Sequence, residues 1–238
     1  MIEISKKITT NVGRTNAKFG LIKENDRIMI GFSGGKDSLT LLHTLNRMQK
    51  KAPFKFDFKA VTITYGMGEQ IEFLSNHCKE HGIEHEIIDT QIFDLAGEKI
   101  RKNSSFCSFF SRMRRGYLYT TALEQGYNKI ALGHHLDDAM ESYFMNLFYN
   151  GTMRTMPPIY KANNGLEVIR PLIFCRERQL RAFADSNEIR VIGDEACPGL
   201  RFDVKMPHAR ATTKELLAKL EEQNPKIFVS MKAAFSNI

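Results

Sequence analysis

Short apolar runs alternate along the chain with longer segments whose apolar residues recur at helical spacing. Residues 27–32 form a β-branched and apolar run that predicts a buried strand, and Leu41, Leu42, Leu45 and Met48 follow at the spacing of one helix face. Further strands are predicted at 56–64, 84–89, 128–133 and 165–172, and further helices at 72–82, 108–125 and 135–149. Strands separated by helices predict right-handed crossovers and a parallel sheet.

The pattern changes near the end of the chain. After residue 172 it is helical over 176–188 and again over 211–235, with an interruption at Pro225. We therefore expect an N-terminal helical segment over 1–24, a central α/β domain over 25–172 and a small C-terminal helical extension over 173–238.

Composition narrows the class of protein. Of 238 residues, 42% are hydrophobic and 26% are charged, which is typical of a soluble globular protein and argues against general disorder. No run approaches the roughly 20 apolar residues that span a bilayer, and the first residues lack the apolar core of a signal peptide. We expect a cytoplasmic protein without membrane contact. Its net charge of +7 favours an anionic partner.

The segment "GFSGGKDS", residues 31–38, joins the first predicted strand to a helix. Its adjacent glycines let the backbone approach an anion, and the helix N-terminus offers unpaired N–H groups, so the segment predicts a phosphate site. It is not a Walker loop, because Asp37 follows Lys36 directly and the upstream glycine is missing. A carboxylate beside the lysine suits a phosphate chain that carries Mg²⁺. The alternative is a glycine turn whose polar residues only cap the helix.

A second polar cluster, "LGHHLDD", begins where another predicted strand ends. Ligands of open parallel sheets gather at the carboxyl ends of strands, so Gly133, His134, Asp137 and Asp138 are expected to face the same crevice as the loop. The carboxylates can hold Mg²⁺. Acidic residues are also favoured in a first helical turn by the helix dipole alone, and that interpretation stays open.

These motifs resemble a known family. "SGGKDS" is similar to the signature of the PP-loop ATP pyrophosphatases, and "CSFFSRMRRG", "KIALGHHLDD", "MNLFYNGTMRTMPP" and "VIRPLIFCRE" resemble stretches of the tRNA 2-thiocytidine synthetases. The resemblance implies a Rossmann-like parallel sheet with helices on both faces. It implies an enzyme that uses ATP to replace the C2 oxygen of an anticodon-loop cytidine with sulfur. The implied partners are tRNA, a sulfur donor such as a cysteine desulfurase, and a second copy of the chain.

The resemblance also implies roles for particular residues. The ATP site would comprise the glycine loop and the start of the second cluster, with Lys36 and Asp37 counted among the catalytic residues and with Mg²⁺ on Asp37 and Asp138. The implied ATP-binding residues are Ser33, Gly34, Gly35, Lys36, Asp37, Ser38, Gly133 and His134.

Family members carry a 4Fe–4S cluster on three cysteines, two of them from a C-x-x-C pair. Here Cys107 matches the first position of that pair and Phe110 the second, while Cys197 matches the third ligand. A phenylalanine cannot bind iron, so a cluster needs another third ligand, for which Asp194 and Cys175 are candidates. Glu195 is a further candidate for the third ligand, and we expect Cys78 to be structural.

Two alternatives to the cluster stay open. Cys107 and Cys197 can act as a thiol pair in which one carries a persulfide and the other resolves it as a disulfide, and neighbouring guanidinium groups favour the thiolate of Cys107. Either cysteine can also be a buried small hydrophobe.

The arginines after Cys107 suggest contact with phosphate. On a helix Arg112 and Arg115 share a face while Arg114 diverges, and arginine geometry suits phosphate oxygens of ATP or tRNA. A solvated helix face is the alternative. Further basic residues occur at Arg176, Arg178, Arg181, Lys205, His208 and Arg210.

Two alternative functions stay open. One uses a different nucleophile, and the other is not catalytic. A lysidine-forming relative would keep the adenylation and use an amine, and it would retain activity without Cys107 and Cys197. A non-catalytic module would bind RNA and use ATP only as a structural ligand.

Overall fold

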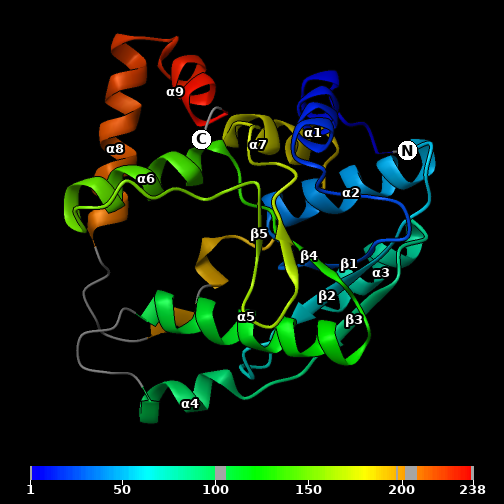
Figure 1. Ribbon diagram of the computed structural model, residues 1–238. Coiled ribbons are helices and arrows are strands. Elements are labelled where there is room, and N and C mark those ends of the chain that lie inside the picture. Colours follow the sequence, from blue (N-terminus) through cyan, green and yellow to red (C-terminus); the bar gives the residue numbers. More distant parts are fainter. Residues whose placement is uncertain (1, 100–105, 197, 202–207, 237–238) are drawn as a thin grey trace.

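A computed structural model describes residues 2–99, 106–196, 198–201 and 208–236. Its centre is a six-stranded sheet in the order β3-β2-β1-β4-β6-β5, in which β5 alone runs antiparallel to its neighbour (Figure 1). Chain order reverses between β1 and β4, which makes the carboxyl ends of these two strands a topological switch point. The strands are β1 (Arg27–Gly31), β2 (Asp57–Ile63), β3 (His85–Ile88), β4 (Lys129–Ala131), β5 (Ile159–Lys161) and β6 (Glu167–Ile169).

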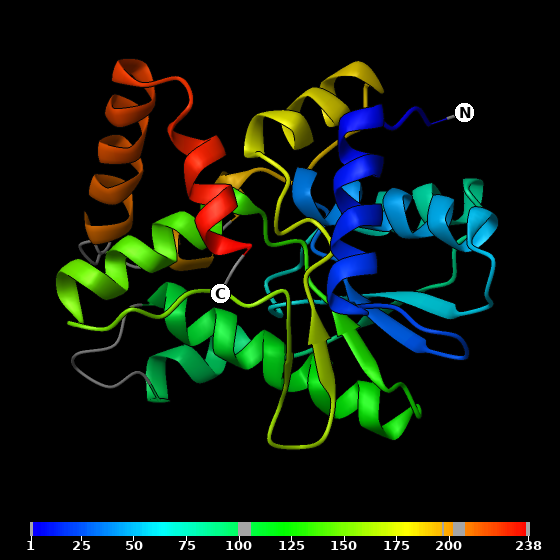
Figure 2. The same cartoon turned by 45° about the horizontal axis from the view of Figure 1, so that its top comes forward.

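Helices cover both faces of the sheet (Figures 1 and 2). One face carries α1 (Lys6–Phe19), α2 (Lys36–Lys51), α3 (Glu72–Glu80) and α7 (Glu177–Ser186). The other carries α4 (Ile92–Lys99) and α5 (Phe106–Glu124). Beyond the carboxyl edge lie α6 (Leu136–Tyr149), α8 (His208–Gln223) and α9 (Ile227–Phe235), and two short 3₁₀ helices cover Asp194–Ala196 (η1) and Pro198–Arg201 (η2).

The alternation of side chains along β1 explains why both faces are apolar. Ile28 and Ile30 pack into the hydrophobic cluster beneath α1, α2 and α7, while Met29 packs into the cluster beneath α4 and α5. A strand that is buried on both faces reads as a continuous apolar run, which is the pattern seen at 27–32.

A buried lysine ammonium group lies at the amino end of the sheet. The ammonium group of Lys129, on β4, is 1% exposed and lies 3.0 Å from a carboxylate oxygen of Asp26 and 3.0 Å from one of Glu167. It also donates a hydrogen bond of 2.8 Å to the carbonyl of Leu21. Every contact of this ammonium group is therefore made by the protein itself.

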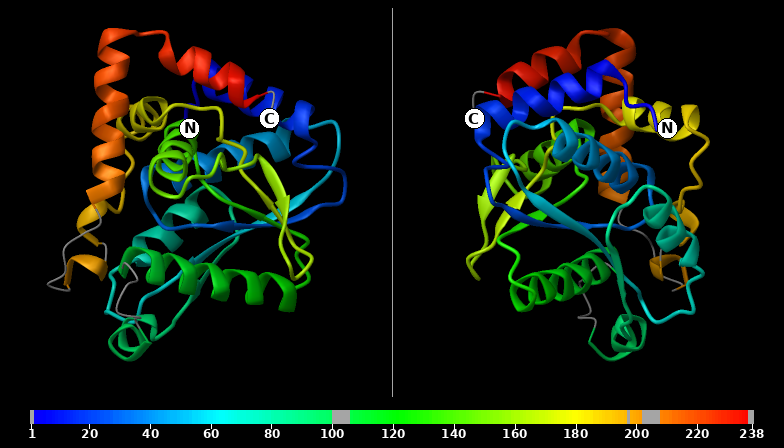
Figure 3. Two further views of the ribbon diagram at one scale, coloured as in Figure 1. Left: turned by 60° about the vertical axis from the view of Figure 1, so that its left-hand side comes forward. Right: turned by 90° about the vertical axis from the view of Figure 1, so that its right-hand side faces the viewer.

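The predicted fold class is confirmed, with three differences in detail. The segment after the third strand, for which no helix was predicted, contains α4, and β5 was not predicted. The interruption expected at Pro225 separates α8 from α9. The C-terminal extension is also joined to the chain start: α9 lies beside α1 (Figure 3), where Lys232 donates a 2.8 Å hydrogen bond to the Asn11 side chain. The division at residues 24 and 172 stays a prediction.

Candidate active site

The phosphate loop, residues 31–38, connects β1 to α2 and is closed by one side chain. The Ser38 hydroxyl accepts a hydrogen bond of 3.3 Å from the N–H of Ser33 and donates one of 3.0 Å to the carbonyl of Gly35. No side chain in the described part of the chain caps the start of α2, whose first N–H groups can therefore bind an anion. Ser38 thus shapes the loop, whereas the backbone ahead of it can bind phosphate.

Gly34 is held against a segment from the far end of the chain. Its φ of +78° is in the left-handed region that favours glycine. Its carbonyl accepts a 2.9 Å hydrogen bond from the N–H of Ile192. A Cβ at this position would lie 2.7 Å from Cδ1 of Ile192 and 2.9 Å from a methyl carbon of Leu74, so only glycine fits.

Gly133 has a similar steric reason to be glycine. A Cβ here would lie 3.0 Å from the carbonyl carbon of Asp37 and 3.2 Å from the nitrogen of Ser38, both of which belong to backbone. The chain after β4 therefore touches the start of α2 directly. The two polar clusters are therefore in contact. The cleft that the phosphate loop lines does not include Gly133, His134, Asp137 or Asp138 among its lining residues, so their predicted position in one crevice with the loop stays a prediction.

The Asp37 carboxylate has a buried oxygen atom that suits a cation. Its Oδ1 atom is buried, and the described part of the chain offers it no hydrogen-bond partner. Burial raises the pKa of Asp37, although His135 and Lys36 partly offset the effect. Among the described pairs, the nearest side-chain nitrogen to Oδ1 is Nε2 of His135 at 3.8 Å, which also lies 3.4 Å from Asp138. An oxygen of this kind is a fitting ligand for Mg²⁺.

Lys36 lies between two carboxylates. Its Nζ atom is 3.4 Å from Asp37 and 3.2 Å from Glu177, at the start of α7. Burial opposes the charged form of Lys36, but the two carboxylates outweigh it and raise its pKa. Burial also opposes the charge of Glu177, yet hydrogen bonds from Lys214 and Lys36 lower its pKa to about 2. Lys36 is a fixed cation beside the loop.

The acidic pair at the start of α6 is held by arginines. Asp137 accepts hydrogen bonds from Nε of Arg176 at 3.0 Å and from the N–H of Glu177 at 2.7 Å. Asp138 accepts one of 2.6 Å from Arg210 and forms a capping box with His135. Asp138 therefore caps its own helix. The alternative that the helix dipole alone favours this acidic pair stays open, and the role of Asp138 as a Mg²⁺ ligand stays a prediction.

His134 is a neighbour of the site with a different partner. Its Nδ1 atom accepts a 3.2 Å hydrogen bond from Nε of Arg170, and Arg170 stacks its guanidinium on the ring of Tyr160. Burial, and then the charge of Arg170, lowers the pKa of His134 to about 4. The imidazole is neutral at physiological pH. Its predicted contact with ATP stays a prediction.

A cleft of about 700 Å³ opens at the carboxyl edge of the sheet. Ser33, Gly35, Lys36 and Asp37 of the phosphate loop line one side of it. The other sides are formed by residues 62–65, 67–71 and 73 after β2, Arg114 of α5, Arg181 of α7, and residues 190–193, 195 and 196. The cleft thus joins the loop to elements that carry, or immediately precede, the predicted sulfur-site cysteines.

The three arginines of α5 separate as the helical spacing predicts. Arg112 and Arg115 are exposed, whereas Arg114 lines the cleft. Nη1 of Arg114 donates a 2.8 Å hydrogen bond to the Tyr65 hydroxyl, and its guanidinium lies over the Tyr65 ring. Arg114 is therefore the arginine placed to meet a ligand in the cleft, and the other two present charge on the surface.

Residues that flank the two predicted sulfur-site cysteines in sequence lie near the cleft. The structure describes the main chain of α5 through Cys107 but not its side chain, and Cys197 lies outside the described residues. Positions 107, 110 and 114 share one face of α5 by their spacing. Glu195 and Ala196, just before Cys197, line the cleft, and η2, just after it, contacts α5.

The remaining ligand candidates differ in their surroundings. Phe110 is 2% exposed and packs against Tyr65, Phe93 and Phe109, so position 110 offers hydrocarbon to the interior. Cys175 is fully buried in the cluster on the opposite face of the sheet, and burial raises its pKa to about 12. The structure therefore does not bring Cys175 to α5. Only the main chain of Asp194 is described, within η1.

Sequence reasoning missed several contributors to the site. Glu177 pairs with Lys36, and Arg176 and Arg210 hold the acidic pair, although the sequence presented these arginines only as basic groups. Arg176 and Glu177 open α7 after the turn of residues 170–175 that follows β6, and this position beyond a parallel strand is the signal that could have found them. Nothing in the sequence indicates the contact between Ile192 and Gly34.

A phosphate-type loop at the switch point of a mostly parallel sheet defines a nucleotide-binding α/β protein. Beside this loop lies a buried carboxylate oxygen that has no hydrogen-bond partner among the described residues. Residues 4–205 match the PP-loop domain family. The chain is 43% identical over 236 residues to a tRNA-cytidine(32) 2-sulfurtransferase of Geobacter metallireducens and 41% identical over 235 residues to one of Geobacter sulfurreducens, covering 98% of this chain and 90% of each relative.

Solved structures agree on the fold. The U34-tRNA thiolase NcsA from Methanococcus maripaludis, solved with its 4Fe–4S cluster, superimposes with a TM-score of 0.78 at 24% identity, covering 98% of this chain and 78% of that one. An NH3-dependent NAD synthetase from Campylobacter jejuni reaches a TM-score of 0.55 at 16% identity, covering 98% of this chain and 93% of that one. The chain belongs to the tRNA-cytidine(32) 2-sulfurtransferase family of PP-loop proteins.

Proposed function

We propose that this chain is an ATP-dependent tRNA sulfurtransferase that adenylates the C2 oxygen of cytidine 32 and replaces it with sulfur. Its relatives at 37–43% identity carry that activity in their names and match nearly the whole chain. The observation that carries the proposal for this molecule is the single cleft, which joins the phosphate loop to Arg114 of the helix that bears Cys107 and to Ala196 beside Cys197.

The phosphate loop performs the adenylation half. The first N–H groups of α2 and the ammonium group of Lys36 bind the phosphate chain, and ATP phosphates compete with Glu177 for Lys36. The buried Oδ1 atom of Asp37 fits Mg²⁺, which supplies charge neutralisation on the phosphates when it is bound. The C2 oxygen attacks the α-phosphorus, the bond to the bridging oxygen breaks, and pyrophosphate leaves with that electron pair.

The two cysteines perform the sulfur half. The terminal sulfur of a persulfide on Cys107 attacks C2, and the C2–O bond breaks as AMP leaves with its electron pair. The thiolate of Cys197 then attacks the inner sulfur, so the sulfur–sulfur bond breaks and the thiocarbonyl keeps the transferred atom. This leaves a disulfide between Cys107 and Cys197, which a dithiol reductant returns to two thiols with two electrons.

An iron–sulfur cluster on three cysteines does not fit this chain. Phe110 occupies the second ligand position and is buried among aromatic rings, and Cys175 lies in the cluster on the other face of the sheet. A cluster here would require Cys107, Cys197 and a non-cysteine donor such as Asp194. The mechanism above therefore uses only the thiols of the chain.

The partners follow from the same reaction. We propose that the anticodon arm of tRNA lies across the cleft, where exposed Arg112 and Arg115 on α5 contact its phosphates. A cysteine desulfurase is the proposed persulfide donor, the proposed compartment is the cytoplasm, and a homodimer remains our prediction. No helix in the described part of the chain is long and apolar enough to cross a membrane.

Complementation tests the function. A strain that lacks its own gene for this activity is supplied with the wild-type chain, Cys107→Ala, Cys197→Ala or Cys78→Ala, and 2-thiocytidine in its tRNA is quantified. We expect thiolation from the wild type and from the control Cys78→Ala, which removes a buried thiol of α3. Loss is expected for the other two. Unchanged 2-thiocytidine with either variant refutes the sulfur mechanism, and tRNA-stimulated adenylation that consumes an amine points to a lysidine-type ligase.

Restoring the missing cysteine tests the delivery of sulfur. After anaerobic reconstitution we expect Phe110→Cys to hold about four irons per chain and the wild type far fewer. The substitution also empties a buried ring site, so the variant should lose about 3 kcal/mol of unfolding free energy. About four irons in the wild type would instead assign the cluster to this chain with a third donor other than position 110.

A further inference from the structure

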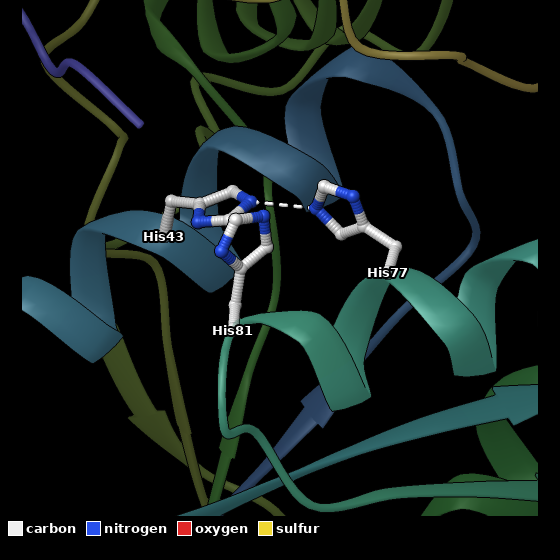
Figure 4. Close-up of side chains that lie close together, drawn as sticks. All are labelled: His43, His77 and His81. Atoms are coloured by element: carbon white, nitrogen blue, oxygen red, sulfur yellow. Dashed lines mark hydrogen bonds between the residues drawn. The ribbon is translucent and has the colours of Figure 1, made fainter. Parts of the chain in front are cut away.

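Three histidines meet on the face of the sheet covered by α2 and α3 (Figure 4), and none of the three lines the cleft. His43 belongs to α2, His77 to α3, and His81 caps the C-terminus of α3. One ring nitrogen of each lies within 4.8 Å of the others. The two Nε2 atoms of His43 and His77 are 2.7 Å apart, which requires one of them to donate a hydrogen bond to the other.

The local structure explains why the rings converge. His77 and His81 are four residues apart and therefore share a face of α3, which is turned toward α2. The ring centroids lie 4.7–5.0 Å apart, and the ring planes cross at 69–90°. Rings that cross at such angles are not stacked, and one nitrogen of each ring lies close to those of the other two.

The cluster suits a cation that imidazole binds in its neutral form. His43 is 4% exposed, and burial followed by the proximity of His77 and His81 lowers its pKa to about 3. Burial likewise lowers the pKa of His77. Neutral imidazoles are the metal-ligating form, and an ion bound among them replaces the shared proton of the His43–His77 pair.

We propose that His43, His77 and His81 bind one first-row divalent metal ion, for which Zn²⁺ is the best fit. Three imidazole nitrogens and one open position form a tetrahedral zinc set. With zinc–nitrogen bonds of about 2.0–2.1 Å, ligand nitrogens of a tetrahedron are separated by about 3.3–3.4 Å. The present separations of 2.7 Å and up to 4.8 Å bracket that value, so movements of side chains by about 1 Å assemble the site.

Such an ion would link two helices that border the ATP site. Helix α2 begins at the phosphate loop, and α3 follows directly on the cleft wall at Ile71 and contributes Phe73 to it. His43 and His77 come from these two helices, so a bound ion fixes their separation. The inference is independent of tRNA thiolation and is measured without ATP or tRNA.

The test is a metal titration in a background without the thiols of the sulfur site. The chain carrying Cys107→Ala and Cys197→Ala is prepared without a polyhistidine tag, stripped with chelator and titrated with Co²⁺ and Zn²⁺. We expect one ion per chain, a visible d–d spectrum typical of nitrogen-bound tetrahedral Co²⁺, and a rise in Tm of about 5–10 °C at Zn²⁺ one hundredfold above its Kd.

Variants assign the ligands. His77→Gln with His81→Gln should abolish the spectrum and the Tm rise, and each single variant, including His43→Gln, should weaken binding by more than the roughly 10–100-fold that loss of an outer-shell partner costs. His85→Gln is the matched control, because His85 lies on β3 with Thr62 and Ser75 as partners. Circular dichroism confirms that each variant folds.

Two results would overturn the proposal. One is a binding stoichiometry that the double variant does not change, or no binding by the parent. The other is an intense near-ultraviolet band from sulfur to Co²⁺, which would assign the ion to a thiolate such as Cys78 instead of three imidazoles.

Discussion

The two ends of the central sheet treat buried charge in opposite ways. At the amino end, the Lys129 ammonium group is enclosed by two carboxylates and a carbonyl, so all of its contacts come from the protein. At the carboxyl end, Asp37 keeps a buried oxygen that no described residue satisfies. A buried charge is costly unless it is paired. The difference indicates that the amino end was built for stability and the carboxyl end for a ligand.

Of the variants considered, Lys129→Met should cause the largest change, a loss of stability at the amino end of the sheet. The substitution leaves Asp26, which is 6% exposed, as a buried carboxylate without its cation. We expect a loss of about 3–5 kcal/mol in unfolding free energy, measured by urea denaturation. Thiolation per folded molecule should be unchanged.

The control for this prediction is the same type of substitution, Lys→Met, on β2, which lies on the other side of β1 from β4. Lys59 pairs with Glu84 and Glu86, whose side chains are 67% and 34% exposed, so Lys59→Met leaves no carboxylate buried. Its cost should stay below about 1 kcal/mol. Equal costs for the two variants would contradict the assignment of the amino end to stability.

Asp37→Asn, at the carboxyl end, should have the opposite effect to Lys129→Met: activity should fall while stability is nearly unchanged. Asparagine keeps the shape but loses the charge that fits Mg²⁺, so tRNA-stimulated pyrophosphate release should fall by about 10²–10³-fold. The free energy of unfolding should change by less than about 1 kcal/mol, because the lost carboxylate is not fully paired in the folded chain. Asp57→Asn, at the exposed start of β2, is the control and should do neither. A large loss of stability with activity retained would reverse the roles of the two ends.

The smallest predicted effect concerns pH. The pKa of Glu177 is about 2 in the folded chain against 4.5 for an ordinary glutamate, so its ion pairs add stability above about pH 4.5 that is lost as pH falls toward 2. Glu177→Gln should therefore be less stable than the wild type at pH 7, by below about 1 kcal/mol because Lys214 is largely exposed, and the difference should shrink at pH 3.5.

Urea midpoints at the two pH values, measured without ATP, check this prediction. Glu215→Gln, on an exposed position of α8, serves as the comparison. A difference between Glu177→Gln and wild type that grows on acidification would show that the carboxylate is not stabilised by its lysines.

Hydrophobic periodicity was sufficient for the parallel core because those strands are apolar on both faces. The segment 27–32 and the helix after the phosphate loop were predicted correctly for this reason. β5 was missed because three residues, Ile159–Lys161, are too few to show a period of two and follow a pair of prolines. α4 was missed because its eight residues were too few to establish a helical period in the sequence.

The candidate site was predictable only where ligand chemistry resides in one short segment. "SGGKDS" combines its glycines, cation and carboxylate within six residues, so Ser33, Lys36 and Asp37 could be placed by sequence alone. The partners of the acidic pair come from positions 39 and 72 residues further along the chain, and the histidine cluster joins two helices. Such long-range pairs depend on packing that no local pattern encodes.

The hydrogen bond from Ile192 to Gly34 couples two distant parts of the sequence. Ile192 precedes Cys197 by five residues, and Gly34 lies in the loop that we propose to bind the phosphates. A nucleotide that shifts this bend must either carry the backbone of Ile192 with it or break a 2.9 Å bond. We therefore expect nucleotide binding to displace the segment that precedes the proposed resolving thiol.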